Sequence, residues 1–337
     1  MHPRTLLTLL TLTLAADAWS ATFYVAPGGS GSACTQAEPC AEIATAGRKL
    51  QAGDTLYLRS GTYNQPIRPT DWGGASGTSY SNAITITGYP GETATVTGVV
   101  DFTWASNLHH WILKDFTLDG TARAQAQRTS EAFYAGASVH HVRLDTMTVQ
   151  REPRGWPGIA ISGECDACEV INSRITGWEY GLYIRGTNWL IHNNEIDHQE
   201  GYGVHVYDSG SSRVSGNIVS QNRVHDNGLT LAHGTNSAGI LLSSGSDNHA
   251  TGNTVWGQGH ALAGIQLGRG VNQVTGNTIY SPQAPCIDEG PGSSGSTVEG
   301  NTCHRTDGPA PGDPVLTGSP VAKALPTPSN LRLLRTP

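Results

Sequence analysis

The chain has 337 residues, of which 42 are glycine, and only 14% of its residues are charged. This composition, with few charged helix formers and many turn-forming residues, indicates an all-β protein. The formal net charge of −7 argues against a nucleic-acid partner, because a phosphate backbone is bound by basic surfaces.

Residues 1–20 are predicted to be a secretory signal peptide. Met1–Arg4 carries one positive charge, Leu6–Ala15 is apolar, and the small residues Ala18 and Ser20 suit a cleavage site. A membrane anchor is the alternative, but this run is too short to span a bilayer and no later run approaches that length. We therefore expect a secreted (extracellular or periplasmic) protein without membrane contact after cleavage.

Six cysteines fit an exported chain, because disulfides persist in oxidising compartments. They form three pairs that are close in sequence: Cys34 and Cys40, Cys165 and Cys168, Cys286 and Cys303. Pairing in this order is our prediction among many connectivities. For the C-x-x-C motif of Cys165 and Cys168 a zinc or redox site is the alternative, but no second motif or thioredoxin-like context accompanies it.

The N-terminal segment predicts a strand, a short helix and a second strand. Thr22–Val25 and Thr55–Arg59 have strand character, and residues 41–50 form an amphipathic helix. The arrangement resembles the N-terminal cap of secreted right-handed parallel β-helix proteins of the pectate-lyase-like superfamily, and the resemblance covers most of residues 22–305. A solenoid needs such a cap, because its open end exposes core and strand edges.

From Ala83 onward short strands alternate with turns. The first are Ile84–Ile86, Ala94–Val96, Trp111–Leu113 and Val139–Val142. A glycine then opens a recurring strand at positions 158, 181, 203, 239 and 264, in steps of 23, 22, 36 and 25 residues, and Cys286 continues the series. The apolar spacing of two excludes helical repeats, so we expect a coil with about three short parallel strands per turn.

A second series places an asparagine before successive strands. Its members are Asn194, Asn217, Asn253, Asn277 and Asn301. These amides are predicted to stack from coil to coil as a ladder, with a simple turn preference of asparagine as the alternative. Because the repeat stops after His304, we expect one β-helix domain over residues 21–305 and a Pro/Gly-rich tail over residues 306–337.

Side chains that alternate along each repeat strand define an outward row. Counting the glycine as first, the third and fifth residues point outward and the second and fourth inward. The third positions are Ala160, Tyr183, His205, Leu241, Gln266 and Asp288; the fifth positions are Ser162, Arg185, Tyr207, Ser243 and Gly268. Tyr183, Arg185, His205 and Tyr207 are therefore predicted to cluster within about 5–10 Å on two coils.

Substrate-binding candidates surround this cluster. They are Tyr180, Tyr183, Tyr202, Asp208, Arg154, Trp156, His233 and Gln266. Arg154 and Trp156 precede a repeat strand and are predicted to form one wall. His233 lies in the excess of about twelve residues over 222–237, and long insertions in a regular scaffold tend to carry function. Aromatic side chains here could stack on sugar rings.

The cluster fits proton abstraction next to a carboxylate, as in β-elimination from a uronate polymer. Arg185 is predicted to neutralise the carboxylate, because a guanidinium pairs with it through two hydrogen bonds. His205 is predicted to be the base, since an imidazole titrates near neutrality, and Tyr207 the acid that protonates the departing O4. The reverse assignment stays open, because a neighbouring guanidinium favours a phenolate.

The stretch from Tyr202 to Asp208, YGVHVYD, is similar to the Y-G-F-D-P-H-D motif of mannuronan C5-epimerases, which share the β-helix fold and act at the C5 proton. Tyr202, Gly203 and Asp208 match this motif. His205 replaces the first Asp of the motif and Tyr207 replaces its His. The resemblance implies a related uronate chemistry, while the changed proton-handling residues put epimerisation in doubt.

Two other functions remain as alternatives: a glycoside hydrolase or a carbohydrate-binding β-helix without chemistry. A hydrolase needs two carboxylates, about 5 Å or 6.5–9.5 Å apart, and the outward row offers only Asp288. No cofactor is expected, although Asp197, Glu200 and Asp208 could bind Ca²⁺. The expected partner is an acidic polysaccharide, and the protein is expected to be a monomer. His109, His110, His140 and His141 are expected to be polar surface residues.

Overall fold

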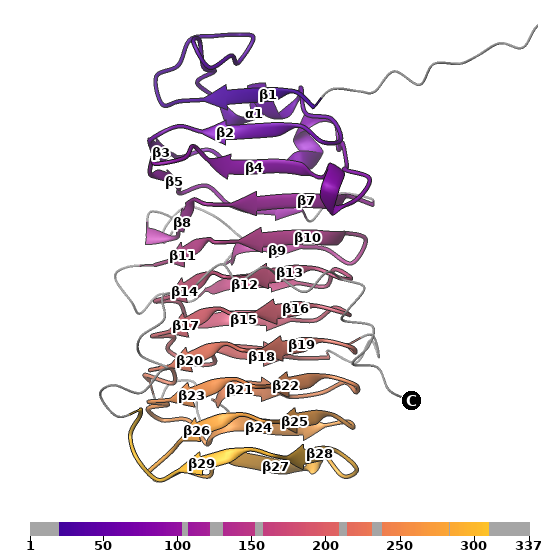
Figure 1. Ribbon diagram of the computed structural model, residues 1–337, viewed down its shortest axis with the longest axis vertical. Coiled ribbons are helices and arrows are strands. Elements are labelled where there is room, and N and C mark those ends of the chain that lie inside the picture. The colour runs from indigo at the N-terminus through magenta and orange to yellow at the C-terminus, as the bar shows by residue number, and fades with distance from the viewer. Residues whose placement is uncertain are drawn as a thin grey trace, which may run out of the picture.

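The computed structural model describes residues 20–102, 107–121, 131–151, 158–208, 214–230, 238–282 and 284–309. In this part of the chain, short strands follow one another around a common axis, and successive coils stack from the N-terminal to the C-terminal end (Figure 1). Every strand pair is parallel, so the expected all-β parallel β-helix is confirmed.

Three parallel sheets form the sides of the solenoid. Sheet A comprises β1 (Thr22–Val25), β2 (Thr55–Leu58), β4 (Ile84–Gly88), β7 (His109–Lys114), β10 (His140–Asp145), β13 (Glu169–Ile171), β16 (Leu190–His192), β19 (Ile218–Ser220), β22 (His249–Thr251), β25 (Gln273–Thr275) and β28 (Thr297–Glu299). Sheet B comprises β3 (Gly61–Tyr63), β5 (Ala94–Val96), β8 (Thr117–Asp119), β11 (Thr148–Gln150), β14 (Arg174–Thr176), β17 (Glu195–Asp197), β20 (Arg223–His225), β23 (Thr254–Trp256), β26 (Thr278–Tyr280) and β29 (Thr302–His304). Sheet C comprises β6 (Val100–Phe102), β9 (Glu131–Ala135), β12 (Ile159–Gly163), β15 (Tyr180–Ile184), β18 (Val204–Val206), β21 (Ala238–Leu242), β24 (Ala263–Arg269) and β27 (Ile287–Gly292).

The inward residues of the three sheets form one continuous apolar core. Val204 and Val206 of β18 are fully buried, as are Ile196 of β17 and Ile191 of β16. Burying a side chain of this size stabilises the fold by roughly 1.5–3 kcal/mol. The recurring glycine is required by close packing, because a Cβ atom at Gly203 would lie 2.6 Å from the carbonyl oxygen of the next coil.

The N-terminal end is closed by a helix that is shorter than predicted. α1 (Ile43–Gly47) buries Ile43 and Ala46 against the first coil. The 3₁₀ helix η1 (Pro69–Trp72) brings Trp72 against Gly47, where a larger residue would clash. A second 3₁₀ helix, η2 (Tyr80–Asn82), precedes β4. None of the helices in the described residues has the length and apolar character needed to cross a membrane.

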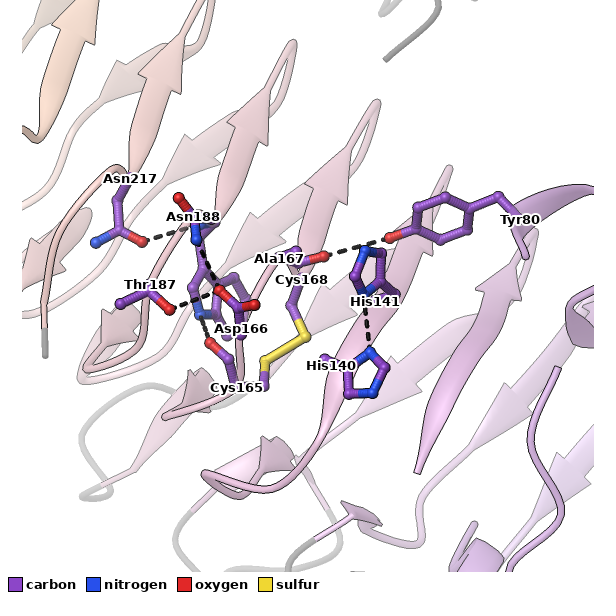
Figure 2. Close-up of a disulfide and its surroundings, with 11 residues drawn as sticks. Tyr80, His140, His141, Cys165, Asp166, Ala167, Cys168, Thr187, Asn188 and Asn217 are labelled. Atoms are coloured by element: carbon purple, nitrogen blue, oxygen red, sulfur yellow. Dashed lines mark hydrogen bonds between the residues drawn. A yellow bond between two sulfur atoms is a disulfide. The ribbon is translucent and has the colours of Figure 1, made fainter. Parts of the chain in front are cut away.

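All three disulfides join the predicted partners, so sequence-order pairing is confirmed: Cys34–Cys40, Cys165–Cys168 and Cys286–Cys303. The Cys165–Cys168 bridge closes a turn before β13, where Asp166 accepts hydrogen bonds from Thr187 (2.6 Å) and Asn188 (2.8 Å) of the next coil (Figure 2). Both sulfurs are buried and bonded to each other, which leaves no thiolate for zinc.

The amide ladder is present, but the predicted series combined two ladders. At the start of the sheet B strands, amides stack from Asn194 through Asn222, Asn253 and Asn277 to Asn301, with Nδ2···Oδ1 distances of 2.9–3.0 Å. Asn217 instead precedes the sheet A strand β19 and belongs to a second ladder, with Asn248 and Asn272. The sequence series was wrong at Asn217 because each coil carries two asparagine corners.

The register of the outward row is as predicted from β15 onward. Tyr183 lies opposite His205, His205 opposite Leu241, and the row continues to Gln266 and Asp288. The preceding coil was misaligned. Ile161 pairs with Leu182, so Ser162, and not Ala160, stands opposite Tyr183. The step between these coils is 21 residues and not the 23 between the glycines, so Ala160 takes the buried position that corresponds to Gly181.

The extra residues after His205 fall in two turns and not in one insertion over 222–237. Ile218 lies 12 positions after Val206, whereas their counterparts Leu190 and Ile184 are 6 apart. Ile240 lies 15 positions after His225, against 7 in the preceding coil. Residues 222–227 are regular, since they contain β20 and its flanking ladder amides. The first of these turns joins β18 to β19 and the second joins β20 to β21, the strand that pairs with β18.

The predicted signal peptide, except for Ser20, and the tail beyond residue 309 lie outside the described residues.

Candidate active site

A cavity of about 420 Å³ opens on the outer side of sheet C, over β9, β12, β15 and β18. Its lining includes five residues that the sequence singled out: Tyr180, Tyr183, Arg185, Tyr202 and His205. Three of the four members of the predicted cluster, Tyr183, Arg185 and His205, therefore share one site, which we call the sheet C pocket. Stacking of coils brings these residues together, because Tyr183 and His205 occupy equivalent positions on paired strands.

His205 lies at the bottom of this pocket and is 6% exposed. The rings of Tyr202, Tyr183 and Tyr207 surround it at centroid distances of 4.5, 4.7 and 5.3 Å. Neither ring nitrogen has a hydrogen-bond partner among the described residues. Burial lowers the pKa of His205 to about 3, because the charged imidazolium loses its hydration. The expectation that His205 titrates near neutrality was wrong, since sequence position does not report burial.

The tyrosines of the sheet C pocket are neutral phenols. Burial raises the pKa of Tyr180 to about 12, and the Glu179 carboxylate adds to this effect. Burial also raises the pKa of Tyr202 and Tyr183, although Arg185 acts in the opposite direction on Tyr183. The rings of Tyr180 and Tyr202 stack at 5.2 Å on adjacent coils. This wall is apolar on its faces and carries hydroxyl donors at its edge.

Arg185 is held at the rim by two residues of earlier coils. Its Nη1 lies 3.0 Å from Oε1 of Glu164, and its Nη2 lies 3.5 Å from the Tyr134 hydroxyl. Glu164 is therefore the ion-pair partner of Arg185. The Arg185 Nε is buried and has no hydrogen-bond partner in the described part of the chain.

Tyr207 and Asp208 do not line the sheet C pocket. They line a neighbouring groove with residues of the following coils, and the Asp208 backbone N–H donates to Ser244 Oγ at 2.7 Å. Tyr207 is placed between the two cavities, since its ring also contacts Tyr183 at 5.5 Å. Gln266 lies two coils beyond His205 and donates to Asp288 at 2.9 Å, so it is not part of the pocket.

Three lining residues were not predicted as site residues, and three predicted ones cannot be placed. Glu131, Ile159 and Ser162 belong to the two preceding coils. The correct register would have revealed them, because Glu131 and Tyr180 both stand opposite Ile159. Arg154, Trp156 and His233 lie outside the described residues.

No group of three or more histidine, cysteine, aspartate or glutamate side chains within the described ranges could hold a metal ion. The acidic trio of Asp197, Glu200 and Asp208, which the sequence offered as a possible calcium site, is therefore not such a group. Asp197 is buried on sheet B and is paired with Arg174 (2.9 Å) and His198 (2.7 Å).

The four histidines expected at the surface form a half-buried stacked cluster. His109 stacks on His140 and His110 on His141, each at 4.7 Å, and the ring of Tyr80 contacts His110 at 5.6 Å. Burial and the neighbouring imidazoles lower the pKa of His110 to about 4. The cluster lies on the sheet A side, away from the sheet C pocket.

The comparisons with known proteins agree with this architecture. The family model described as "Right handed beta helix region" matches residues 157–313. An alginate lyase from Paenibacillus sp. str. FPU-7 superposes with a TM-score of 0.56 at 16% identity, over 86% of this chain and 97% of that one. The pectate lyase Pel9A gives a TM-score of 0.55 at 14% identity, over 90% of this chain and 82% of its own.

A glycoside hydrolase superposes with a TM-score of 0.58 at 10% identity, over 84% of this chain and 97% of that chain. No curated protein is significantly similar to the chain in sequence. The superpositions establish the fold, and sequence identities of 10–16% say nothing about the reaction. The chain thus has a right-handed parallel β-helix fold, which it shares with the alginate lyase, the pectate lyase and the glycoside hydrolase.

Proposed function

We propose that the chain is an exported lyase that cleaves an acidic polysaccharide by β-elimination in the sheet C pocket. One observation carries the proposal: a guanidinium, a buried neutral imidazole and several phenols line a single cavity. Elimination next to a carboxylate needs a cation, a base and an acid, and this set of side chains supplies each of them.

In this reaction Arg185 binds the uronate carboxylate. Glu164 fixes one side of the guanidinium, and a guanidinium has five N–H donors, so donors remain for a substrate carboxylate. The positive charge stabilises the electron density that moves from C5 toward the carboxylate when the C5 proton leaves. Arg185 therefore determines that the sugar at the cleavage point is acidic.

His205 accepts the C5 proton. Burial keeps the imidazole neutral over the physiological range, and neither ring nitrogen has a hydrogen-bond partner among the described residues, so a nitrogen lone pair can accept the proton. The C5–H electron pair forms the C4=C5 double bond, and the C4–O4 bond breaks. A phenol protonates the departing O4. Tyr183 is the better placed acid, because it lines the pocket beside His205, whereas Tyr207, our first candidate, stands outside it.

The lining supports a lyase over a hydrolase. Among the described residues that line the sheet C pocket, Glu131 is the single carboxylate, and hydrolysis by the usual mechanisms uses two. C5 epimerisation would begin with the same proton abstraction and differ in the return of a proton. A binding protein would use the same groove without chemistry.

Uronate polymers are the proposed substrates. Two of the superposable structures are an alginate lyase and a pectate lyase, whose substrates carry a carboxylate at C5. Export is supported by the three disulfides, which suit an oxidising compartment. We propose that the protein acts there as a monomer, without a metal.

The test is a panel of alginate, pectate and glycosaminoglycans, followed by the ultraviolet absorbance of unsaturated uronate ends. Growth of this absorbance with one acidic polymer is the expected result. New reducing ends without it would indicate hydrolysis, and an altered sugar composition without cleavage would indicate epimerisation. Binding of a polymer without any product would indicate a carbohydrate-binding β-helix without catalytic activity.

A further inference from the structure

A second cavity, of about 860 Å³, lies on the coils that follow the sheet C pocket along the axis of the solenoid. Four successive coils contribute to its wall, from Tyr207 after β18 to Gly292 at the end of β27. At the usual spacing between neighbouring strands, the groove is about 14 Å long. Its elongated form fits an extended polymer better than a single sugar.

Tyr207 lies between the two cavities. This residue lines the groove, and its ring lies 5.3 Å from that of His205 and 5.5 Å from that of Tyr183, which both line the sheet C pocket. A polymer that extends from the pocket over Tyr207 therefore enters the groove.

Arg269 supplies the charge of this groove. Among the described lining residues it is the single basic side chain, it is exposed, and no described residue forms an ion pair or side-chain hydrogen bond with it. It stands opposite Gly292, where a Cβ atom would collide with the Arg269 Cγ. The glycine thus leaves space for the arginine side chain. Asp208, the acidic residue of the groove, lies two coils away near the pocket.

Arg269 and Arg185 are separated by three coils, from β15 through β18 and β21 to β24, which corresponds to about 14 Å. We propose that the groove is a second binding subsite, in which Arg269 pairs with a carboxylate of the same acidic glycan whose cleaved uronate is bound by Arg185. This inference rests on the proposed function and adds a requirement for length and charge: an oligomer must span both arginines and carry an acid at each.

The test is titration calorimetry with oligouronates of alginate and pectate, as dimers and hexamers. A His205→Gln background prevents turnover, so that the readout is independent of catalysis. Arg269→Ala is expected to weaken hexamer binding about tenfold, the loss of one charge-assisted pair, and to leave dimer binding unchanged. Arg269→Lys should recover part of the affinity, and Arg48→Ala, which removes an exposed arginine at the N-terminal cap, should change neither.

Equal hexamer affinity in the Arg269→Ala and Arg48→Ala proteins would overturn the subsite, as would an equal loss for dimers and hexamers. If neither length binds with Arg269 intact, the subsite and the proposed function both fail. If hexamer binding depends on Arg269 while the wild-type protein releases no unsaturated product, the subsite stands and the lyase assignment fails.

Discussion

The ring of Tyr183 meets the ring of His205 edge to face, with centroids 4.7 Å apart and an interplanar angle of 86°. The two residues are 22 positions apart in the sequence, and the pairing of β15 with β18 places them side by side. An imidazole that is surrounded by three tyrosine rings is shielded from water, and this shielding gives the sheet C pocket its chemistry.

Replacing His205 with glutamine should abolish turnover and preserve the fold. The amide retains polar atoms at the same place but cannot accept the C5 proton, so the rate should fall about 100-fold to 10,000-fold. The measurement is the rate of unsaturated-end formation, with thermal unfolding as the control for folding. A variant that kept the wild-type rate would exclude His205 as the base.

Tyr183→Phe should lower the rate to a similar degree while leaving substrate affinity nearly unchanged. The ring contacts with His205 and Tyr207 remain, and the change removes only the hydroxyl that would protonate O4. Tyr207→Phe serves as the matched variant one coil away. If Tyr207→Phe caused the larger loss in the rate, the acid would be Tyr207 and our original assignment would return.

Arg185→Ala should reduce kcat/KM by at least about 100-fold, because the carbanion-like intermediate loses its neutralising cation. Arg185→Lys should restore part of the rate, since it keeps the charge but not the two-pronged geometry. The control is Arg59→Ala, which removes an arginine paired with Glu92 in the N-terminal coils. Unchanged kcat/KM in Arg185→Ala would contradict the role of Arg185.

Because His205 is buried, the protein should become less stable as the pH falls. The folded pKa is about 3, whereas an unfolded histidine has a pKa of about 6.5. Between these values the unfolded chain binds the extra proton, so His205 destabilises the fold by about 1.4 kcal/mol per pH unit as the pH falls. Its contribution to stability is complete above about pH 6.5.

Urea unfolding of the wild-type and His205→Gln proteins between pH 4 and pH 7 measures this effect. The difference between their free energies of unfolding should change with this slope. Other histidines cancel in the comparison, including His225, whose pKa is raised by hydrogen bonds to Asp226 and Glu195 despite its burial. A pH-independent difference would show that His205 is accessible to protons in the folded state.

The asparagine ladder should make a large and local contribution to stability. Asn222 Oδ1 accepts hydrogen bonds from the backbone N–H and the Nδ2 of Asn194, at 2.9 and 3.0 Å. Asn222→Ala leaves the backbone N–H and one of the two Nδ2–H groups of Asn194 without a partner, which should cost about 2–4 kcal/mol. The matched control is Gln273→Ala, because that amide is exposed on sheet A. Equal unfolding free energies of the two variants would contradict a structural role for the ladder.

The sequence by itself determined the architecture. The glycine steps of mostly 22–25 residues and the apolar spacing of two indicate a stack of parallel strands, and they place Tyr183 and His205 on the same outward row. The three local cysteine pairs followed from their spacing in the chain. These features are periodic or local, so a linear pattern is sufficient to predict them.

Only the tertiary structure decided which side chains share a cavity and which are shielded from water. Gly158 lies two residues before the position that pairs with Gly181, so the sequence pattern placed Ser162 one outward position too far along its strand. Each coil carries an asparagine at two corners, and this concealed the second ladder. The burial of His205 depends on rings from three sequence positions that converge above it. The imidazole was recognised in the sequence as a group that moves protons, but its low pKa comes from lost hydration, which is a property of the packed coils.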